Sequence, residues 1–420
     1  MPRLTKIWAV RKGVPSAVLS RFPREASVAI VLLCLTRIPF ACQGAMAQSQ
    51  AAAPAHRTES FRNFPLTKFY DTPDPLPPGK PGELIRSAEF DGYNLPLGVS
   101  AVRLLYHSRS ANNNDIAVSA VALFPDEKPP TGGWPVIAWA HELRGVARVC
   151  APSLARNLPH GPFLSMYVQL GYAVVATDYA GLGTNFRNAF ADMSSNALDV
   201  IYSIPPARRA IPQLGPRWIA MGTGEGGMAV AAIAEVEHQI QDPNYLGSIT
   251  LSRLADLQDI YESASPLSLK SPLFLTYGIK TVFPQFEVNE VLTDRAVPLY
   301  QQIGKTCGGT EALTEISAAG MLKPNWKTNT LVQSYFGRNR LGLKPANAPL
   351  LIVGSENDPS IAETTKIVDR LCKQGDQVQF QKYPEYDPGR VIGDSVRDQI
   401  AWIQARFANR SARSTCSPQP

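Results

Sequence analysis

The sequence predicts an α/β fold, with a mostly parallel central sheet, helices on both of its faces and a helical cap inserted into the chain. Short continuous apolar runs alternate with segments of helical periodicity, and one long, mostly helical stretch interrupts this alternation. Apolar runs of this kind are typical of strands buried on both faces, and strands that alternate with helices form parallel sheets. The 420 residues, 45% hydrophobic and 18% charged, suffice for one large domain of this type with insertions.

Residues 1–47 have the three parts of a secretory signal peptide. A long positively charged region is followed by an apolar stretch at 26–35 and by the cleavage pattern Ala45-Met46-Ala47, so the mature chain is expected to begin at Gln48. The apolar stretch is short for a membrane span, and no second one follows. We expect a secreted or periplasmic protein without an integral membrane segment; an uncleaved anchor or a misassigned start codon is the alternative.

The mature chain divides into an arm, a core and a cap. Residues 48–90 are rich in proline and are predicted to form a surface arm, because proline does not join a sheet interior. The core is expected at 91–245 and 346–420, and the cap at 246–345, where prolines interrupt a helical stretch and no core strand is predicted. Such an insertion would cross the carboxyl edge of the sheet, where ligands enter α/β folds. Core strands are predicted at 102–106, 116–124, 135–140, 171–176, 218–221, 350–353 and 378–383, and core helices at 158–170, 189–203, 228–236 and 362–373.

A glycine-rich turn follows the strand predicted at 218–221 and leads into a helix. Its sequence is Gly222-Thr-Gly224-Glu-Gly226-Gly227. Strand, tight turn and helix are the context of a nucleophile elbow, G-x-S-x-G, in which the central residue carries the nucleophile. The central residue here is Gly224, which has no side chain. Thr223 is an alternative nucleophile outside the central position. The turn lies far from the first strand, where a dinucleotide-binding loop belongs, which argues against a nucleotide site.

Several motifs together resemble one family. They are Gly133-Trp-Pro-Val-Ile-Ala-Trp-Ala-His141, Cys150-Ala-Pro-Ser153, Gly171-Tyr-Ala-Val-Val-Ala-Thr-Asp-Tyr179 with Gly181-Leu-Gly183, the elbow, and Ala401-Trp-Ile403 with Arg406-Phe407. Over residues 69–416 the chain resembles the secretory lipases, secreted triacylglycerol lipases with an α/β-hydrolase fold. The resemblance implies this fold, with a helical cap over the carboxyl edge of the sheet.

The resemblance also implies where the catalytic residues would fall. The serine falls on Gly224, the acid on Asp358 and the histidine on Pro388. The oxyanion loop falls on residues 141–145, beginning with His141 and with Glu142 in place of a glycine, and Glu225 follows the serine position. Asp178 is expected to be a hydrogen-bond acceptor that stabilises the fold, and Asp358 has the alternative role of capping the next helix.

Histidine positions exclude the usual triad without reference to any family. The five histidines are at 56, 107, 141, 160 and 238, so none follows Asp358, whereas the hydrolase fold orders its triad as serine, acid and histidine. Loss of nucleophile or base removes activity by a factor on the order of a million in a well-studied serine protease. We therefore expect a lipase homologue that has lost catalysis.

Three functions remain open at this point. The first is a catalytically silent protein that binds a lipid or other apolar small molecule under the cap, whose apolar residues core packing explains equally well. These are Leu267, Leu269, Leu273, Phe274, Leu275, Phe283 and Phe286. The second is an active esterase with a non-standard constellation, for which His141 and His160 are the nearby imidazoles. The third is a secreted partner-binding protein.

Acidic residues are expected to gather around the former catalytic centre. They are Glu142, Glu225, Asp358, Glu385 and Asp387. A solvated acidic rim is one interpretation, and a pocket for a cationic ligand or a hard metal ion is the other.

The cysteine positions favour disulfides, and the cysteine spacing and charge distribution argue against metal sites and nucleic-acid binding. Cys150, Cys307, Cys372 and Cys416 remain after the leader, which favours two disulfides, and spacing allows three pairings. The resemblance implies the pairs Cys150–Cys307 and Cys372–Cys416. No C-x-x-C spacing occurs, so neither a structural metal nor a cofactor is expected. The net charge of +6 is scattered along the chain, which argues against nucleic-acid binding.

Overall fold

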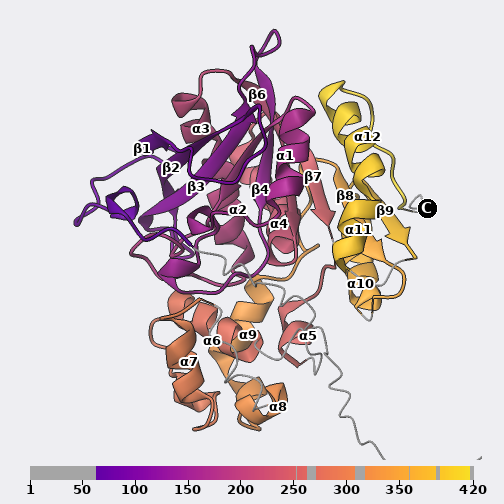
Figure 1. Cartoon of the computed structure of the whole chain (residues 1–420). Coiled ribbons are helices and arrows are strands. Elements are labelled where there is room, and N and C mark those ends of the chain that lie inside the picture. Colours follow the sequence, from indigo (N-terminus) through magenta and orange to yellow (C-terminus); the bar gives the residue numbers. More distant parts are fainter. Residues whose placement is uncertain are drawn as a thin grey trace, which may run out of the picture. The chain divides into compact units, whose positions relative to one another are not determined.

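One mixed sheet organises the chain in the computed structural model, which describes residues 63–251, 253–262, 271–307, 317–358, 360–384 and 388–416. In these residues nine strands form the order β1-β2-β3-β5-β4-β6-β7-β8-β9 (Figure 1). The first three pairings are antiparallel and the other five are parallel. The strands are β1 (Leu84–Glu89), β2 (Val99–Arg109), β3 (Asp115–Pro125), β4 (Trp134–Ala140), β5 (Ala173–Thr177), β6 (Leu214–Thr223), β7 (Tyr245–Leu251), β8 (Leu350–Ser355) and β9 (Val378–Tyr383).

Helices cover both faces of the sheet, as predicted. In β4, Val136 and Ala138 belong to one buried apolar cluster, and Ile137 and Trp139 belong to the other. This alternation explains why the strand reads as a continuous apolar run. The first cluster includes residues of α2 (Met193–Tyr202), α3 (Ile204–Ala210), α4 (Glu225–Ile240) and α10 (Ile361–Lys373). The second includes residues of α1 (Gly161–Gln169), α11 (Pro388–Asp394) and α12 (Val396–Phe407).

Two strands lie where none was predicted. β7 lies inside the segment predicted as cap, so the predicted cap boundary at residue 246 is wrong and the insertion begins after this strand. Its sequence, Tyr-Leu-Gly-Ser-Ile-Thr-Leu, has Gly247, Ser248 and Thr250 in place of a continuous apolar run. β1 lies in the predicted surface arm, where it pairs with the edge of β2 after the last proline of that arm. An edge strand keeps one side open to solvent, which explains its polar composition.

The cap helices gather below the sheet in the view of Figure 1. They are α5 (Leu257–Glu262), α6 (Ser271–Val282), α7 (Val297–Ile303), α8 (Ala318–Met321) and α9 (Thr330–Arg338). Three polar contacts fasten α9 and the residue after it to the core: the Tyr335 hydroxyl donates to the carbonyl of Phe190, Asn339 accepts the backbone N–H of Met193 at 2.7 Å, and Arg338 pairs with the buried Asp192 at 3.0 Å.

Apolar cap residues pack into the core. Leu273, Leu275 and Phe286 are fully buried and belong to the first apolar cluster. Packing therefore accounts for them, while Leu267 and Leu269 lie outside the described residues. In the described part of the chain, no helix is both long and apolar enough to cross a membrane. The predicted signal peptide at 1–47 also lies outside the described residues.

One of the two implied disulfides is formed. Cys372, in the last turn of α10, is bonded to Cys416 in the C-terminal tail. Cys150 and Cys307 are both free thiols, so the second implied bond is absent from the structure, although the two thiols contact each other through a hydrogen bond. Cys150 is buried and Cys307 is exposed.

Candidate active site

The turn between β6 and α4 has the backbone of a nucleophile elbow. Gly224 has φ +56°, in the left-handed region that favours glycine. A Cβ atom on Gly226 would lie 2.1 Å from the carbonyl oxygen of Ala140, and one on Gly222 would lie 2.4 Å from the carbonyl oxygen of Gly226. Only glycine fits at these flanking positions, because the turn packs directly against the end of β4.

Glu142 lies directly in front of Gly224. Strands β4 and β6 are paired so that Ala140 lies beside Gly222, which brings the residues that follow each strand together. A Cβ atom on Gly224 would lie 3.0 Å from the Cβ of Glu142 and 3.6 Å from its Cα. Glu142 therefore occupies much of the space into which a side chain at position 224 would extend.

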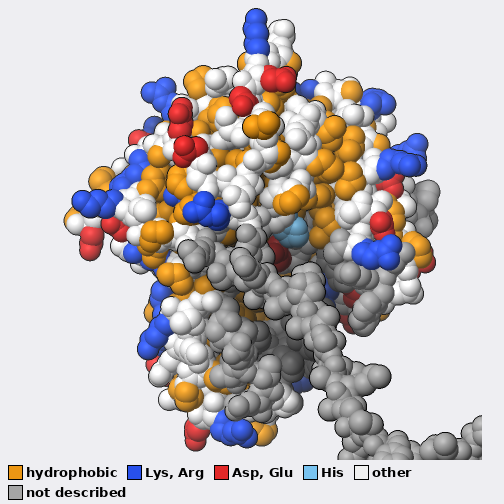
Figure 2. Space-filling model, in the orientation of Figure 1, with side chains coloured by type: hydrophobic (Ala, Val, Ile, Leu, Met, Phe, Trp, Pro, Cys, Tyr) orange, Lys and Arg blue, Asp and Glu red, His pale blue; other side chains and the backbone are white. Residues whose placement is uncertain are grey.

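The Glu142 carboxylate contacts an imidazole and a guanidinium. Its Oε2 lies 2.9 Å from Nε2 of His160, and its Oε1 lies 3.7 Å from a guanidinium nitrogen of Arg144. Burial raises the pKa of Glu142, but the hydrogen bond and charge of His160 outweigh this and bring the pKa to about 2. The side chains of Glu142 and His160 keep 31% and 26% of their surface exposed, so solutes can reach the pair. Figure 2 shows one imidazole in a surface hollow with an acidic side chain beside it.

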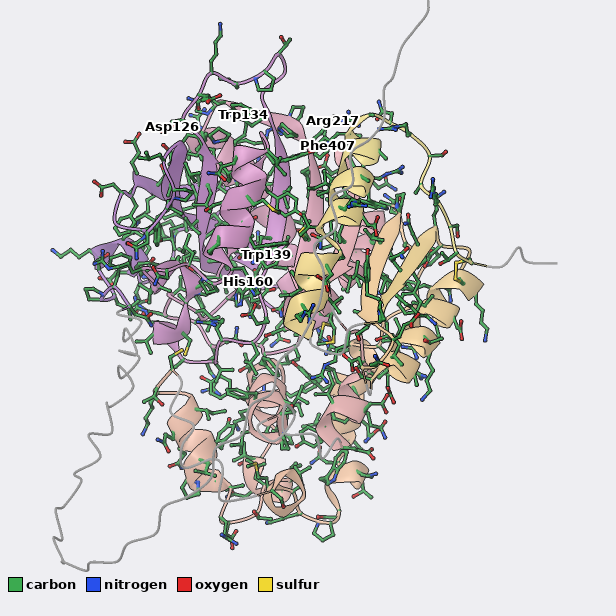
Figure 3. All side chains as sticks on the ribbon, turned by 45° about the vertical axis from the view of Figure 1, so that its right-hand side comes forward. Asp126, Trp134, Trp139, His160, Arg217 and Phe407 are labelled. Carbon is green, nitrogen blue, oxygen red and sulfur yellow. A yellow bond between two sulfur atoms is a disulfide. The ribbon has the colours of Figure 1, made fainter. Side chains whose placement is uncertain are left out.

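His160 is held by its backbone and by an aromatic neighbour. It has φ +56° and immediately precedes α1, where a left-handed conformation is uncommon outside glycine and is tolerated by Asn, Asp and His. Its ring lies 5.5 Å from that of Trp139, centroid to centroid, and Figure 3 labels both side chains. The imidazole is therefore fixed between the end of β4 and the start of α1.

The other predicted candidates for a base or nucleophile are buried. Both ring nitrogens of His141 face carbonyl oxygens, Nδ1 at 2.6 Å from Glu142 and Nε2 at 3.2 Å from Asp178. Burial lowers the pKa of His141, which favours the neutral ring. Thr223 is the last residue of β6 and is 5% exposed. Both residues are therefore buried, whereas His160 is accessible to solutes.

Among the described carboxylates of the predicted acidic cluster, Glu142 and Glu225 interact electrostatically, since the charge of Glu142 contributes to the raised pKa of Glu225. Glu225 turns away from the elbow and accepts hydrogen bonds from the backbone of Ala191 and the amide of Asn196, both at 2.9 Å. Burial raises its pKa to about 7. Asp358 accepts from the backbone and the hydroxyl of Ser360, which is the residue before α10, so its carboxylate stabilises the turn that leads into this helix. Glu385 and Asp387 lie outside the described residues.

Two further predicted positions have clear places in the fold. Asp178, fully buried, accepts hydrogen bonds from Ser119 and Ser153, which confirms its structural role. Pro388 begins α11, and its assignment as the histidine position stays a prediction, as do those of Gly224 and Asp358. Within the described ranges, no cluster of three or more His, Cys, Asp or Glu residues has the geometry of a metal site.

The contact between Glu142 and His160 was not predicted from the sequence. Both residues were singled out, one as an oxyanion-loop residue and the other as a nearby imidazole. They lie 18 positions apart and on separate elements. No local periodicity encodes such a contact. The helix predicted at 158–170 included His160, whereas α1 begins at Gly161.

Comparison with solved structures places the fold among ester hydrolases. Lipase A from Candida antarctica matches with a TM-score of 0.72 and 16% identity, over 86% of this chain and 90% of that one. The rice cell wall degrading esterase LipA from Xanthomonas oryzae matches with a TM-score of 0.63 and 16% identity, over 76% of this chain and 98% of that one. No protein-family model and no curated protein matches the sequence. The chain therefore has the α/β-hydrolase fold seen in lipases and esterases.

Proposed function

We propose that this chain is a secreted member of the secretory lipases that has lost the acyl-enzyme reaction and binds an acyl or other apolar ligand at its former catalytic cleft. The observation that carries the proposal is the contact between Gly224 and Glu142. The elbow backbone is retained, but its central residue has no nucleophile, and the Glu142 stem lies where that nucleophile would extend.

The negative charge of Glu142 at the elbow also supports the loss of the acyl-enzyme reaction. A lipase stabilises negative charge on the substrate oxygen with backbone N–H groups in a preorganised site. Here the ionised Glu142 carboxylate stands beside that site and is balanced by His160 and Arg144. A serine alone would therefore meet a crowded position and an unfavourable charge.

A serine-directed probe tests the loss of the acyl-enzyme reaction. The native protein is treated with an alkyl fluorophosphonate, which phosphonylates activated serines, and its mass is measured. We expect no adduct. The triple variant Gly224→Ser, Glu142→Gly, Pro388→His should gain an adduct on the peptide that spans residues 218–227; Pro388 begins α11, where proline is dispensable.

Ligand binding is tested separately by calorimetry of the native protein with decanoate. Saturable binding that a fluorescent fatty acid competes for supports the proposal. An adduct on the native protein would place a working serine elsewhere in the chain and overturn the loss of the acyl-enzyme reaction. Absence of heat and of competition would overturn ligand binding and favour a partner-binding role of the surface.

A further inference from the structure

A polar cavity lies where the cap helices α5 and α9 meet the core helix α10. It has a volume of about 400 Å³, which is within the range of small-molecule sites. The described residues that line it come from the start of α5, from α9 and the turn after it, and from α10. Among these lining residues, none belongs to the loops that follow β4 and β6, so the cavity is not part of the elbow.

Helical spacing directs two faces of the chain toward this cavity. Lys366 and Arg370 are four residues apart on α10, and residues at this spacing share one face of a helix. Gly337 lines the cavity from α9 without a side chain. A Cβ atom on this glycine would lie more than 4 Å from every other element of the described structure. The wall formed by α9 therefore leaves open space at this position.

One ion pair of the cavity wall is already saturated. Arg370 donates to both carboxylate oxygens of Asp256, at 3.0 and 2.7 Å, and its Nε donates to the carbonyl of Leu341 at 2.9 Å. All three nitrogens of this guanidinium therefore have a partner within the protein. The pair fixes the junction of cap and core and leaves the recognition of a ligand to other side chains.

Three charged side chains of the lining lack such close partners. Arg340 approaches Asp256 only to 3.7 Å, and its side chain is 53% exposed. Within the described part of the chain, the side chains of Lys366 and Asp259 form neither a hydrogen bond nor an ion pair. Burial and neighbouring carboxylates, Asp256 first, raise the pKa of Asp259, whereas the charge of Lys366 lowers it. Opposite charges thus face the same cavity without touching each other.

We propose that this cavity binds a small zwitterion, a molecule that carries a primary ammonium group and an acidic group. The acidic group pairs with Arg340 and Lys366, because a guanidinium presents N–H groups in a fork that matches carboxylate or phosphate oxygens. The ammonium donates its N–H groups to the Asp259 carboxylate. A simple anion would be repelled by Asp259, and a simple cation would be repelled by the two basic side chains. This second site is independent of the ligand proposed for the elbow.

Two sources of ligand share this chemistry. Free amino acids carry an ammonium and a carboxylate, and the headgroup of phosphatidylethanolamine carries an ammonium and a phosphate. Phosphatidylcholine has the same charges, but its quaternary ammonium has no N–H to donate to Asp259. Vesicles of phosphatidylcholine with and without phosphatidylethanolamine therefore distinguish the two sources, because only a lipid ligand makes the protein sediment with the second kind of vesicle alone.

The test is isothermal titration calorimetry of the purified full chain with zwitterions of increasing length. The probes are glycine, β-alanine, γ-aminobutyrate, 6-aminohexanoate and O-phosphoethanolamine. We expect saturable binding of at least one probe with a dissociation constant of about 1 mM or below. Butyrate and butylamine each carry one of the two charges, and both should bind at least about tenfold more weakly than that probe.

Variants assign the binding to this cavity. Asp259→Asn and Arg340→Gln each remove one charge and should weaken binding at least about tenfold. Gly337→Trp keeps every charge but fills the open space and should abolish binding, whereas Gly337→Ala adds only a Cβ and should keep the native affinity. Lys305→Gln is the matched control, because Lys305 is exposed in the cap and does not line the cavity. Circular dichroism verifies that each variant is folded.

Each outcome decides the inference. Absence of saturable heat with every probe overturns it, and so does equal affinity for butyrate or butylamine, which would show that only one charge is recognised. Native affinity in Asp259→Asn or in Gly337→Trp would place the binding elsewhere and also overturn it. An equal loss in Lys305→Gln would attribute the effect to net charge and contradict the assignment. Losses confined to the cavity variants establish the site, and the vesicles then identify the source.

Discussion

The guanidinium of Arg103 lies 3.4 Å above the ring centroid of Phe90, and it is almost completely buried. It also donates to the Tyr93 hydroxyl at 2.8 Å and to the carbonyl of Ser153 at 3.1 Å. Arg103 belongs to β2, whereas the aromatic residues precede that strand in the chain. One buried cation therefore fastens the N-terminal segment to the sheet.

Replacement of Arg103 should destabilise the fold strongly. Arg103→Met leaves the Tyr93 hydroxyl and the Ser153 carbonyl without a charged donor and removes the contact with Phe90, so we expect a loss of about 2–4 kcal/mol in unfolding free energy. Urea denaturation measures the loss. Arg156→Met is the matched control, because Arg156 lies 4.8 Å from the Phe64 ring centroid in an exposed setting. Equal losses in the two variants would contradict the prediction.

The contact between Gly224 and Glu142 predicts a non-additive pair of mutations. Gly224→Ala introduces a Cβ at a left-handed position and 3.0 Å from the Glu142 Cβ, so it should cost about 1–2 kcal/mol. In a Glu142→Gly background the steric part of the cost disappears and only the backbone part remains. A double-mutant cycle by chemical denaturation should give a coupling of about 0.5–1 kcal/mol. Strict additivity would show that the two residues do not meet.

Glu225 should make stability pH-dependent near neutrality. Burial raises its folded-state pKa to about 7, above its ordinary value of 4.5, so the folded state holds the proton more tightly than the unfolded state. Its contribution is present below about pH 4 and is lost as the pH rises to about 7. Glu225→Gln should remove this dependence, by up to about 3 kcal/mol in the difference between the two pH values. Parallel stability curves for the variant and the native protein would refute the assignment.

The two free thiols should differ in reactivity. The hydrogen bond from Cys150 lowers the pKa of Cys307, whereas the same contact raises the pKa of Cys150. Because the thiolate is the reactive form and Cys307 is exposed, iodoacetamide should alkylate Cys307 first. Peptide mass spectrometry after brief treatment measures this order. Mild oxidation should instead join the two residues, with loss of two hydrogens, and alkylation of Cys150 first would contradict the placement.

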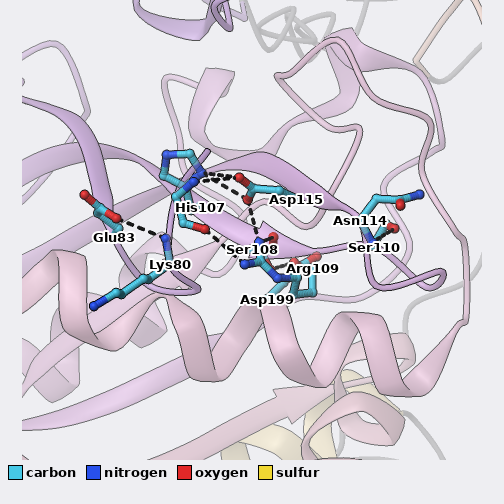
Figure 4. A network of polar contacts seen from close by, with 10 residues as sticks. Lys80, Glu83, His107, Ser108, Arg109, Ser110, Asn114, Asp115 and Asp199 are labelled. Atoms are coloured by element: carbon cyan, nitrogen blue, oxygen red, sulfur yellow. Dashed lines mark hydrogen bonds and ion pairs between the residues drawn. The ribbon is translucent and has the colours of Figure 1, made fainter. Parts of the chain in front are cut away.

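Asp115 should hold the proline-rich segment against β2 (Figure 4). Its carboxylate accepts from the backbone of Gly79 at 2.9 Å, from Arg109 at 2.6 Å and from His107 at 3.0 Å. Burial raises the pKa of Asp115, but these bonds outweigh it and lower the pKa. The contribution is therefore present above about pH 4 and is lost as the pH falls through the lowered pKa. Asp115→Asn should increase cleavage after Glu83 by a glutamate-specific protease by about tenfold. An unchanged cleavage rate would show that the segment is held elsewhere.

Sequence patterns predicted those parts of the fold that depend on local or face-wise regularity. Ile137 and Ala138 alternate between two buried faces, so β4 is a visible apolar run, and the glycines around Gly224 mark the elbow. β7 was missed because Gly247 and Ser248 interrupt its apolar pattern, although the strand lies inside the sheet.

Such patterns could not predict contacts between residues that are far apart in the sequence. Glu225 was expected in the cleft, but Asn196 and the backbone of Ala191 draw its side chain into the interior. His160 was recognised only as a nearby imidazole, because its partner Glu142 is chosen by the register of β4 and the start of α1. Contacts of this kind arise from tertiary packing and leave no periodic signal.

The Cys372–Cys416 bond bears on self-association. It anchors the C-terminal tail along the last strand of the sheet, where Thr415 donates its backbone N–H to the carbonyl of Val378 and its hydroxyl accepts the N–H of Phe380 at 2.9 Å. An uncovered edge strand is a template onto which another chain can add. Reduction of this bond would free the tail and expose β9, so an oxidising environment should keep the protein soluble as well as folded.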